Sequence, residues 1–274
     1  MFHIAPKDAL IPRPTPPPRA AQLGLPDAAS LNRLLADADP LQIMRTAHEV
    51  IGCNRLAVVS SFGIESAALL KLVADVDPAL PVVLLDTGWL FPETLAHRDA
   101  VVAKLGLTDV RSIMPDAHKL QQRDPYADLW STNPDACCAL RKIEPLADAL
   151  TPFTAWVNGR KRYHGGDRTH IPVVEQDGVR LKFNPLARIS SADVVAIAKN
   201  ANLPPHPLTL SKFTSVGCIP CTRRTRPGES VRAGRWSGTG KTECGIHMST
   251  TGIRCSLTVP EALEAGDDQV GAAS

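Results

Sequence analysis

Short apolar runs alternate with helical patterns from Arg55 onward, and this alternation constrains the fold more than any other feature of the chain. The apolar runs predict strands at 56–59, 81–85, 110–113, 154–157 and 181–183. Helical patterns follow the first two runs, and connections of this length are typical of parallel strands joined by crossovers. We therefore expect an α/β fold in which helices flank a parallel sheet.

The chain divides into four parts by composition. Residues 1–28 contain seven of the 24 prolines and are predicted to be a disordered arm. Residues 29–205 form the predicted α/β core. From 206 to 255 the composition changes to Arg, Gly, Thr and Cys, which indicates a C-terminal segment packed on this core or closing over it. Residues 256–274 are expected to be a loose tail.

Charge and hydropathy exclude several classes of protein. The 30 Lys and Arg residues nearly balance the 28 Asp and Glu residues, and the net charge of +2 argues against a nucleic-acid or membrane-surface binder. No apolar run reaches the roughly 18 residues of a membrane-spanning helix, and the start lacks the apolar core of a signal peptide. We expect a cytoplasmic protein without nucleic-acid or membrane partners.

The seven cysteines are an odd number in a chain without an export signal, which favours metal binding or thiol chemistry over disulfides. Cys137 and Cys138 are adjacent, and Cys218 and Cys221 form a C-x-x-C pair. Two such pairs are typical of a zinc site or an iron–sulfur cluster. Neighbouring helical residues point about 100° apart, so Cys137 and Cys138 can reach one site only at a helix end or a distorted turn. This favours a cluster over one ion; the alternative is two buried thiols beside an unrelated C-x-x-C.

Cys244 belongs to neither pair and is a candidate nucleophile. It lies between Gly240-Lys241 and Gly245-Ile246-His247. A thiol near Lys and His loses its proton more easily, and flanking glycines allow the segment to move. The alternative is an incidental exposed cysteine. Cys53 is assigned to the core. Cys255 is treated as incidental, with a resolving thiol as the alternative.

Two polar loops follow strands at the edge of the sheet where α/β proteins bind ligands. Residues 60–66 combine hydroxyls, a glycine and a helix N-terminus, which suits a phosphate or sulfate group, although an N-capped turn would look the same. Residues 86–88 read Asp-Thr-Gly and suit a ribose hydroxyl, a metal or a simple turn.

Basic residues gather in two places. Guanidinium groups bind sulfate and phosphate through paired hydrogen bonds, so the groups predict an anionic substrate; a solvated basic surface is the alternative. The group in the C-terminal segment comprises Arg223, Arg224, Arg226, Arg232 and Arg235. The group after the strand ending at 157 comprises Arg160, Lys161, Arg162 and Arg168.

Several motifs, in the same order, resemble those of the assimilatory sulfonucleotide reductases over roughly residues 40–250. They are Ser61-Phe62-Gly63, Leu85-Asp86-Thr87-Gly88, Cys137-Cys138-x-x-Arg141-Lys142, Asn184-Pro185-Leu186, Gly217-Cys218-x-x-Cys221-Thr222, Pro227-Gly228-Glu229 with Arg232-Ala233-Gly234-Arg235-Trp236, and Lys241-Thr242-Glu243-Cys244-Gly245-x-His247. Within this family, the two cysteine pairs resemble those of the bacterial adenylyl-sulfate (APS) reductases that carry a 4Fe-4S cluster. Relatives that use the 3′-phosphorylated nucleotide (PAPS) typically lack these cysteines.

The resemblance implies an adenine-nucleotide α-hydrolase-like (Rossmann-like) fold and thioredoxin-dependent reduction of APS to sulfite and AMP, in sulfate assimilation and cysteine biosynthesis. The Cys244 thiolate would attack the sulfate sulfur and form a cysteine S-sulfonate, which thioredoxin would then reduce. One 4Fe-4S cluster per chain is implied, and its ligands would be Cys137, Cys138, Cys218 and Cys221. A homo-oligomeric state is left open.

The resemblance also assigns substrate contacts. Lys142 would lie beside the cluster and face the substrate, and Arg232 and Arg235 would bind the sulfate and phosphate groups. Many members have Arg-Arg-Asp-Gln-Ser in the loop that contains Arg162 and Arg168, so these two are assigned by position and not by a matching motif. The residues expected to line the nucleotide pocket are Ser60, Ser61, Gly63, Glu65, Asp86, Thr87 and Gly88.

Three other functions remain open. Reduction of PAPS needs one further cationic contact, and the chain has surplus arginines. An ATP-pyrophosphatase enzyme of tRNA thiolation would have the loop Ser-Gly-Gly-x-Asp-Ser, where this chain has Phe62 and Glu65 in place of the first Gly and the Asp. A zinc-ribbon interaction module would not need Cys244.

Overall fold

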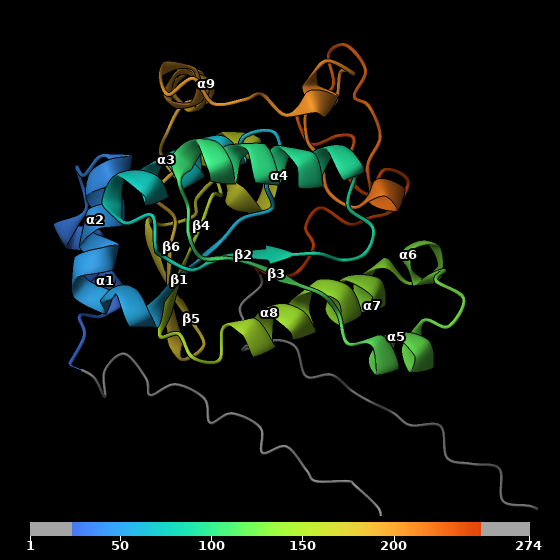
Figure 1. Ribbon diagram of the computed structural model, residues 1–274, viewed down its shortest axis with the longest axis horizontal. Helices are drawn as coiled ribbons and strands as arrows, with labels where there is room; N and C mark the ends of the chain where they lie inside the picture. Colours follow the sequence, from blue (N-terminus) through green and yellow to red (C-terminus); the bar gives the residue numbers. More distant parts are fainter. Residues whose placement is uncertain (1–23, 248–274) are drawn as a thin grey trace, which may run out of the picture.

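The computed structural model describes residues 24–247; most of the predicted arm, the tail and Cys255 lie outside the described residues. A six-stranded sheet with the order β3-β2-β1-β4-β6-β5 forms its centre (Figure 1). All neighbouring strands are parallel except β5 and β6, so the predicted α/β fold is confirmed. The strands are β1 (Leu56–Val59), β2 (Val82–Leu85), β3 (Val110–Ile113), β4 (Ala155–Asn158), β5 (Val174–Asp177) and β6 (Arg180–Phe183).

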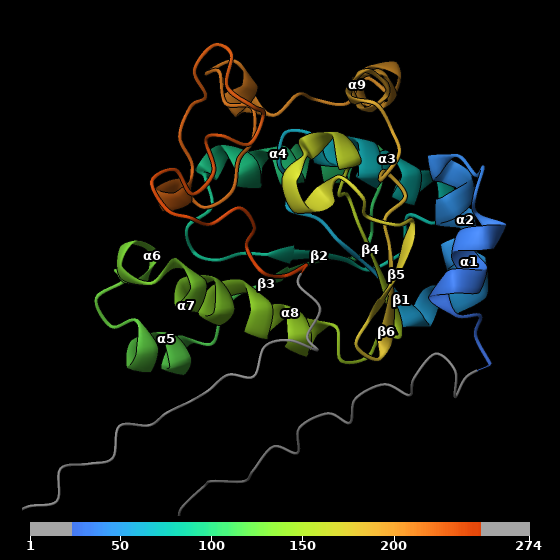
Figure 2. The same ribbon diagram turned by 180° about the vertical axis from the view of Figure 1, so that it is seen from behind.

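Helices cover both faces of the sheet, as Figures 1 and 2 show from opposite sides. One layer contains α2, α3, α4 and α9, and α8 packs against β2 and β3 from the other side. The helices are α1 (Ala28–Leu34), α2 (Pro40–Ile51), α3 (Ser66–Val76), α4 (Pro92–Leu105), α5 (Ala117–Arg123), α6 (Leu129–Thr132), α7 (Pro134–Cys138), α8 (Glu144–Ala149) and α9 (Ser191–Asn200).

Alternate residues of the central strands pack into two separate apolar cores. Leu56 and Val58 of β1 lie in the core shared with α2 and α3, whereas Ala57 and Val59 lie in the core shared with Leu146 of α8. Successive side chains of a strand point to opposite faces of the sheet. A strand covered on both faces is therefore apolar throughout, which explains the continuous apolar runs in the sequence.

Local sequence signals fix the ends of the predicted helices. At the start of α2, the Asp39 carboxylate accepts a hydrogen bond from Gln42 N at 2.8 Å, and the Gln42 side chain accepts one from Asp39 N at 2.9 Å. This reciprocal cap, with Pro40 in the first turn, satisfies two amide groups that the helix leaves unpaired. At the end of α4, Gly106 adopts the left-handed conformation, with φ +66°.

The antiparallel edge strand β5 is absent from the sequence-based strand assignments. It pairs with β6 in a hairpin, in which Asp177 lies opposite Arg180 and Gly178 has φ +60°. The two turn residues are Gly178 and Val179, and glycine at the first position of a two-residue turn is a known hairpin signal, so this strand could have been identified. Its polar sequence, Val-Glu-Gln-Asp, lacks the apolar run on which the strand assignments relied.

Residues 206–247 run along the edge of the sheet formed by the carboxyl ends of its strands. This segment contains two short 3₁₀ turns, Pro207–Thr209 and Ile219–Cys221. An isolated bridge joins Leu90 to Cys218, and the buried His206 ring contacts the Thr94 hydroxyl at 3.0 Å. Within the described range, no helix is both long and apolar enough to cross a membrane.

Leu70 of α3 tests the packing of the larger core. Its side chain is fully buried, so Leu70→Ala should lower the free energy of unfolding by about 2–5 kcal/mol, through lost burial and the cavity that remains. Val195 of α9 is 63% exposed, and Val195→Ala should change this free energy by less than about 0.5 kcal/mol. Urea unfolding followed by circular dichroism measures both. Equal losses would contradict the assignment of Leu70 to the core.

Candidate functional site

A cavity of about 200 Å³ lies at the carboxyl ends of β1, β2 and β4, between the sheet and the C-terminal segment. This is the edge at which parallel α/β sheets bind ligands. Nine residues singled out from the sequence line it: Ser60, Ser61, Gly63, Glu65, Lys142, Arg168, Arg232, Arg235 and Cys244.

The loop after β1 approaches the cavity through a sharp turn. Phe62 has φ +48° and is fully buried, and its amide donates a hydrogen bond to Ser60 Oγ at 3.2 Å. Gly63 lies close to Val216 of the C-terminal segment, since an added Cβ would be 3.4 Å from Val216 Cγ2. The buried ring of Phe62 therefore anchors the loop while its polar residues face the cavity.

Glu65 is the centre of a buried charge cluster in this loop. Its Oε2 atom lies 3.0 Å from Lys161 Nζ and 2.9 Å from His164 Nε2. Burial by itself would raise the pKa of Glu65, but the hydrogen bond from His164 and the charge of Lys161 lower it to about 2. Glu65 is therefore ionised, and its ion pairs connect the loop after β1 to the loop after β4.

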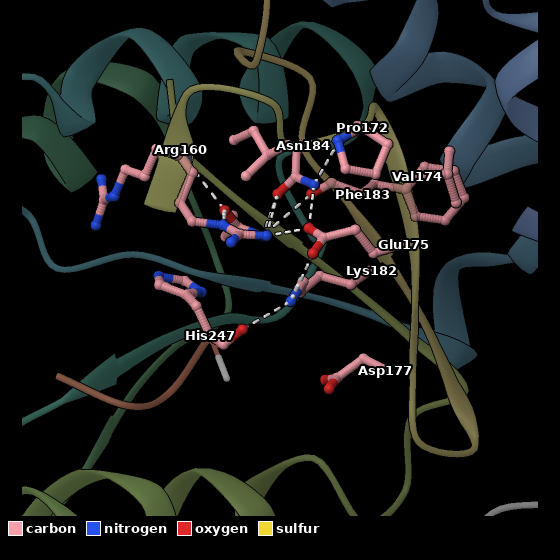
Figure 3. Close-up of polar contacts among 12 residues, drawn as sticks. Arg160, Pro172, Val174, Glu175, Asp177, Lys182, Phe183, Asn184 and His247 are labelled. Atoms are coloured by element: carbon pink, nitrogen blue, oxygen red, sulfur yellow. Dashed lines mark hydrogen bonds and ion pairs between the residues drawn. The ribbon is translucent and has the colours of Figure 1, made fainter. Parts of the chain in front are cut away.

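A second polar network joins β4, β5 and β6 beneath the cavity (Figure 3). Glu175 pairs with Arg160 and lies 3.3 Å from Lys182 Nζ. Asn184 donates to Glu175 Oε1 at 2.5 Å and accepts from Asn158 Nδ2 at 2.8 Å. Arg160 and Asn158 also line the cavity, so this network fixes its floor.

The Cys244 segment, residues 241–247, lines one side of the cavity and is held at both ends. Near its end, the His247 carbonyl accepts a hydrogen bond from Lys182 Nζ at 3.3 Å (Figure 3), and the His247 ring stacks on Trp156. Near its start, Lys241 pairs with Asp135 of α7. The segment thereby connects the sheet to the helix that contains Cys137 and Cys138.

Three cations surround Glu243 and Cys244. Arg168 forms two hydrogen bonds with the Glu243 carboxylate, at 2.5 and 2.8 Å, and Arg232 Nη2 lies 3.3 Å from the same group. Burial would lower the pKa of Lys142, but the neighbouring Cys218 and Cys244 sulfurs raise it above its usual value. Lys142 is therefore charged, and its charge partly offsets the rise in the pKa of Cys138 that burial causes.

Arg235 lines the cavity next to the 3₁₀ turn Ile219–Cys221, whose last carbonyl accepts a hydrogen bond from its Nε atom. Its Nη1 donates to the Val216 carbonyl at 2.8 Å, and its guanidinium stacks on the Trp236 ring at 4.5 Å. Gly217 leaves the room that this arrangement needs, because a Cβ there would collide with the guanidinium. This contact gives a physical reason for the glycine immediately before the C-x-x-C pair.

The four paired cysteines line a second, smaller cavity, which shares Lys142 with the first. Cys137 and Cys138 end α7, and the chain continues as a π-helical turn over Ala139–Ile143, so they occupy the helix end and distorted turn that the sequence predicted. In the other pair, Cys218 immediately precedes the 3₁₀ turn Ile219–Cys221 and Cys221 ends it.

The chemistry of this smaller cavity fits an iron–sulfur cluster. Burial and the neighbouring Cys138 sulfur raise the pKa of Cys137 to about 11, so this thiol forms a thiolate mainly when a metal binds it. The Thr87 hydroxyl lies 3.2 Å from Cys218 Sγ, and the lining contains sulfur donors but neither carboxylate nor imidazole. Within residues 24–247, no three His, Cys, Asp or Glu side chains converge on a point suited to one metal ion.

Four residues expected to bind the nucleotide are absent from the lining of the large cavity within the described chain. The Asp86 carboxylate accepts a hydrogen bond from Gly88 N at 3.1 Å, which is the simple turn considered from the sequence, and Gly88 has φ +74°. Thr87 faces Cys218 instead. The guanidinium of Arg162 donates to the Ile171 carbonyl at 2.9 Å.

Lys161, His164 and Glu243 also belong to the site, although the sequence assigned no specific contact to any of them. Lys161 and His164 belong to the basic loop that was recognised, but their common partner Glu65 is almost one hundred residues away. Glu243 lies beside Cys244 in a recognised motif, but its partner Arg168 is 75 residues away. These residues could have been selected because they are neighbours of candidate residues in the sequence. Their ion-pair partners could not have been predicted from the sequence.

Comparisons with known proteins agree on one family. Residues 55–224 match the phosphoadenosine phosphosulfate reductase domain. An adenosine 5′-phosphosulfate reductase of Mesorhizobium japonicum is 45% identical over 84% of this chain and 90% of its own length. A phosphoadenosine 5′-phosphosulfate reductase of Gloeobacter violaceus is 40% identical over 79% of this chain and 92% of its own length. A crystal structure of phosphoadenylyl-sulfate (PAPS) reductase from Candida auris is 22% identical and shares the fold, with a TM-score of 0.60 over 70% of this chain and 94% of that chain.

The Glu65 cluster predicts a specific pH dependence of stability. The pKa of Glu65 is lowered from 4.5 to about 2 by folding, so its stabilisation is present above pH 4.5 and is lost as the pH falls towards 2. This loss is on the order of 3 kcal/mol. Glu65→Gln should be less stable than the wild type at pH 7, and the difference should shrink in acid. Urea unfolding from pH 7 to pH 3 measures it; the exposed Glu49→Gln is the control, and a constant difference would contradict the ion cluster.

Proposed function

The chain belongs to the phosphoadenosine phosphosulfate reductase family, and on this basis we propose that it is an oxidoreductase that reduces adenylyl sulfate (APS) to sulfite and AMP, with thioredoxin as the reductant. The observation that carries the proposal is the position of Cys244. It lies in one cavity with the loop after β1, Lys142 and Arg235. A nucleophilic sulfur thus meets groups that can neutralise a sulfate and a phosphate.

In the first half of the reaction, the Cys244 thiolate attacks the sulfur atom of APS. A sulfur–sulfur bond forms, and the bond between that sulfur and the bridging phosphate oxygen breaks. Its electron pair leaves with AMP, and Cys244 carries an S-sulfonate. Lys142 and Arg235 stabilise the charge that develops on the sulfate and the leaving phosphate, because fixed cations in a partly buried site need little reorganisation.

In the second half, a thiolate of thioredoxin attacks Cys244 Sγ. Sulfite leaves with the electron pair of the sulfur–sulfur bond, and a mixed disulfide joins the two proteins. The second thiol of thioredoxin attacks this disulfide, which releases Cys244 as a thiolate and thioredoxin as its disulfide. Two electrons pass from thioredoxin to the sulfur of APS. We place this reaction in the cytoplasm, where thiols are kept reduced, in the assimilation of sulfate for cysteine synthesis.

We propose that Cys137, Cys138, Cys218 and Cys221 hold a 4Fe-4S cluster. The four line one cavity, and Lys142 lies between this cavity and that of the substrate. When bound, such a cluster supplies a fixed local charge that its ligands and hydrogen bonds adjust. Lys142 lines both cavities, so the charge of a bound cluster would act on the ammonium group that lies in the substrate cavity.

A second candidate substrate is PAPS, and it is favoured by the Gloeobacter violaceus relative, which is named for the phosphorylated nucleotide. Paired cysteines of the kind found in this chain favour APS. Initial rates of sulfite release with each nucleotide decide between them. We expect a higher kcat/KM with APS, and a higher value with PAPS would make the chain a PAPS reductase.

Replacement of the nucleophile tests the reaction. Cys244→Ser should bind AMP as tightly as the wild type, retain iron, and release no sulfite above the background, because a serine hydroxyl is too weak a nucleophile. Sulfite is measured with APS and reduced thioredoxin under anaerobic conditions. Cys53 is exposed, so its assignment to the core is wrong. It is not among the described residues that line the cavity, and Cys53→Ser should keep wild-type activity. Sulfite release by Cys244→Ser would contradict the mechanism.

Metal analysis tests the four-cysteine site independently of activity. Protein purified without oxygen should contain about four iron and four sulfide per chain. Cys218→Ser should lose most of this iron together with its visible absorbance, whereas Cys53→Ser should lose none. A wild-type protein with zinc in place of iron, or a Cys218→Ser variant with full iron, would refute the cluster assignment.

A further inference from the structure

We infer that Glu243 is a positioning residue, which holds the neighbouring Cys244 in the cavity through its ion pair with Arg168. The inference rests on the proposed role of Cys244 as the nucleophile. This ion pair fixes the C-terminal segment against the core before the substrate reacts. Glu243 itself need not touch the substrate.

The geometry of the Glu243 pair is that of a strong and specific contact. Arg168 presents Nε and Nη2 to the two carboxylate oxygens, at 2.5 and 2.8 Å, and Arg232 adds a third contact at 3.3 Å. The side chains of Glu243 and Arg168 are only 13% and 11% exposed. Paired hydrogen bonds between guanidinium and carboxylate fix orientation as well as distance, and partial burial protects them from screening.

Contacts on both sides of Cys244 restrict its backbone. Consecutive Cα atoms are about 3.8 Å apart, so fixing Glu243 restricts the position of Cys244. On the other side, Gly245 has φ +85° and packs against the π-helical turn, since a Cβ there would lie 2.9 Å from Ile143 Cδ1. The backbone of Cys244 is therefore fixed on one side by the pairing of Glu243 with Arg168 and on the other by the packing of Gly245 on Ile143.

Some cations of the cavity are paired with a carboxylate of the protein, and others are not. Arg168 and Arg232 share the Glu243 carboxylate. Lys142 and Arg235 have no carboxylate ion pair within residues 24–247, and both line the cavity with Cys244. The second group is thus available to an anionic substrate, whereas the first group holds the segment in place.

This division predicts that loss of Glu243 separates catalysis from binding. Glu243→Gln keeps the size of the side chain but removes its charge, so the segment is released while Arg168 and Arg232 gain freedom to bind anions. We expect kcat to fall on the order of 10- to 100-fold, because a displaced nucleophile is rarely aligned with its target. The dissociation constant of AMP should stay the same or decrease. Glu243→Asp, which keeps the charge, should recover part of kcat.

The matched control is Glu229→Gln. Glu229 also forms a two-point ion pair with an arginine of the C-terminal segment, Arg223, at 2.8 and 3.0 Å, but neither residue lines the cavity. Its loss should leave kcat and the affinity for AMP unchanged. A general destabilisation of the segment would affect both variants, whereas a positioning role affects only Glu243.

Alkylation of Cys244 tests the inference without turnover. Each protein is treated with iodoacetamide, and the modification of individual cysteine peptides is followed by mass spectrometry, with the exposed Cys53 as internal reference. Cys244 should react several-fold faster in Glu243→Gln than in the wild type or in Glu229→Gln, and Cys53 should react equally in all three. Arg168→Lys keeps the charge but not the paired hydrogen bonds, so it should also increase the rate at which Cys244 is alkylated. This variant replaces Glu243→Gln in the test if Glu243→Gln fails to fold.

An unchanged alkylation rate of Cys244 in both Glu243→Gln and Arg168→Lys would overturn the inference, as would a weaker affinity of Glu243→Gln for AMP. These outcomes differ from failure of the proposed function. If the wild type released no sulfite from either APS or PAPS, the proposed reaction would be wrong. The alkylation rates would still show whether Glu243 holds the Cys244 segment in place.

Discussion

Parallel strands bring their carboxyl ends to one edge of a sheet, and the whole site depends on this constraint. It places the loop after β1, the loop after β4 and the segment from residue 206 onward around one cavity, although they are far apart in the sequence. The apolar residues of the strands contribute packing and no chemistry. Their burial on both faces fixes the edge at which polar residues can gather, and the C-terminal segment then covers that edge with Cys244.

Buried charges connect the elements that meet there. Glu65 joins the first loop to Lys161, Glu175 joins three strands, and Glu243 joins the Cys244 segment to Arg168. An unpaired buried charge is costly, so each of these carboxylates strongly favours the arrangement in which its cation is present. The result is a site whose cations are oriented before a ligand arrives, and such preorganisation is what a reaction with a charged leaving group requires.

The sequence predicted the parts of the molecule that depend on local pattern. Apolar runs located the parallel strands, the Asp39 cap located α2, and helix geometry correctly required Cys137 and Cys138 to lie at a helix end or a distorted turn. The family resemblance is confirmed by the match over residues 55–224. Motif position did not predict which way a side chain faces: Arg162 turns to a backbone carbonyl, and Thr87 turns to Cys218. Ion pairs such as that of Glu243 with Arg168 form only in the folded chain, and no local signal encodes them.

The central claim is that Cys244 takes the sulfonyl group of the nucleotide before any reductant acts. Intact-protein and peptide mass spectrometry after incubation with APS, without thioredoxin, tests this most directly. The account predicts a mass gain of one sulfonate group on the peptide that contains Cys244, with one AMP released per chain and loss of the adduct when reduced thioredoxin is added. An unmodified Cys244, or a sulfonate on another cysteine, would contradict it.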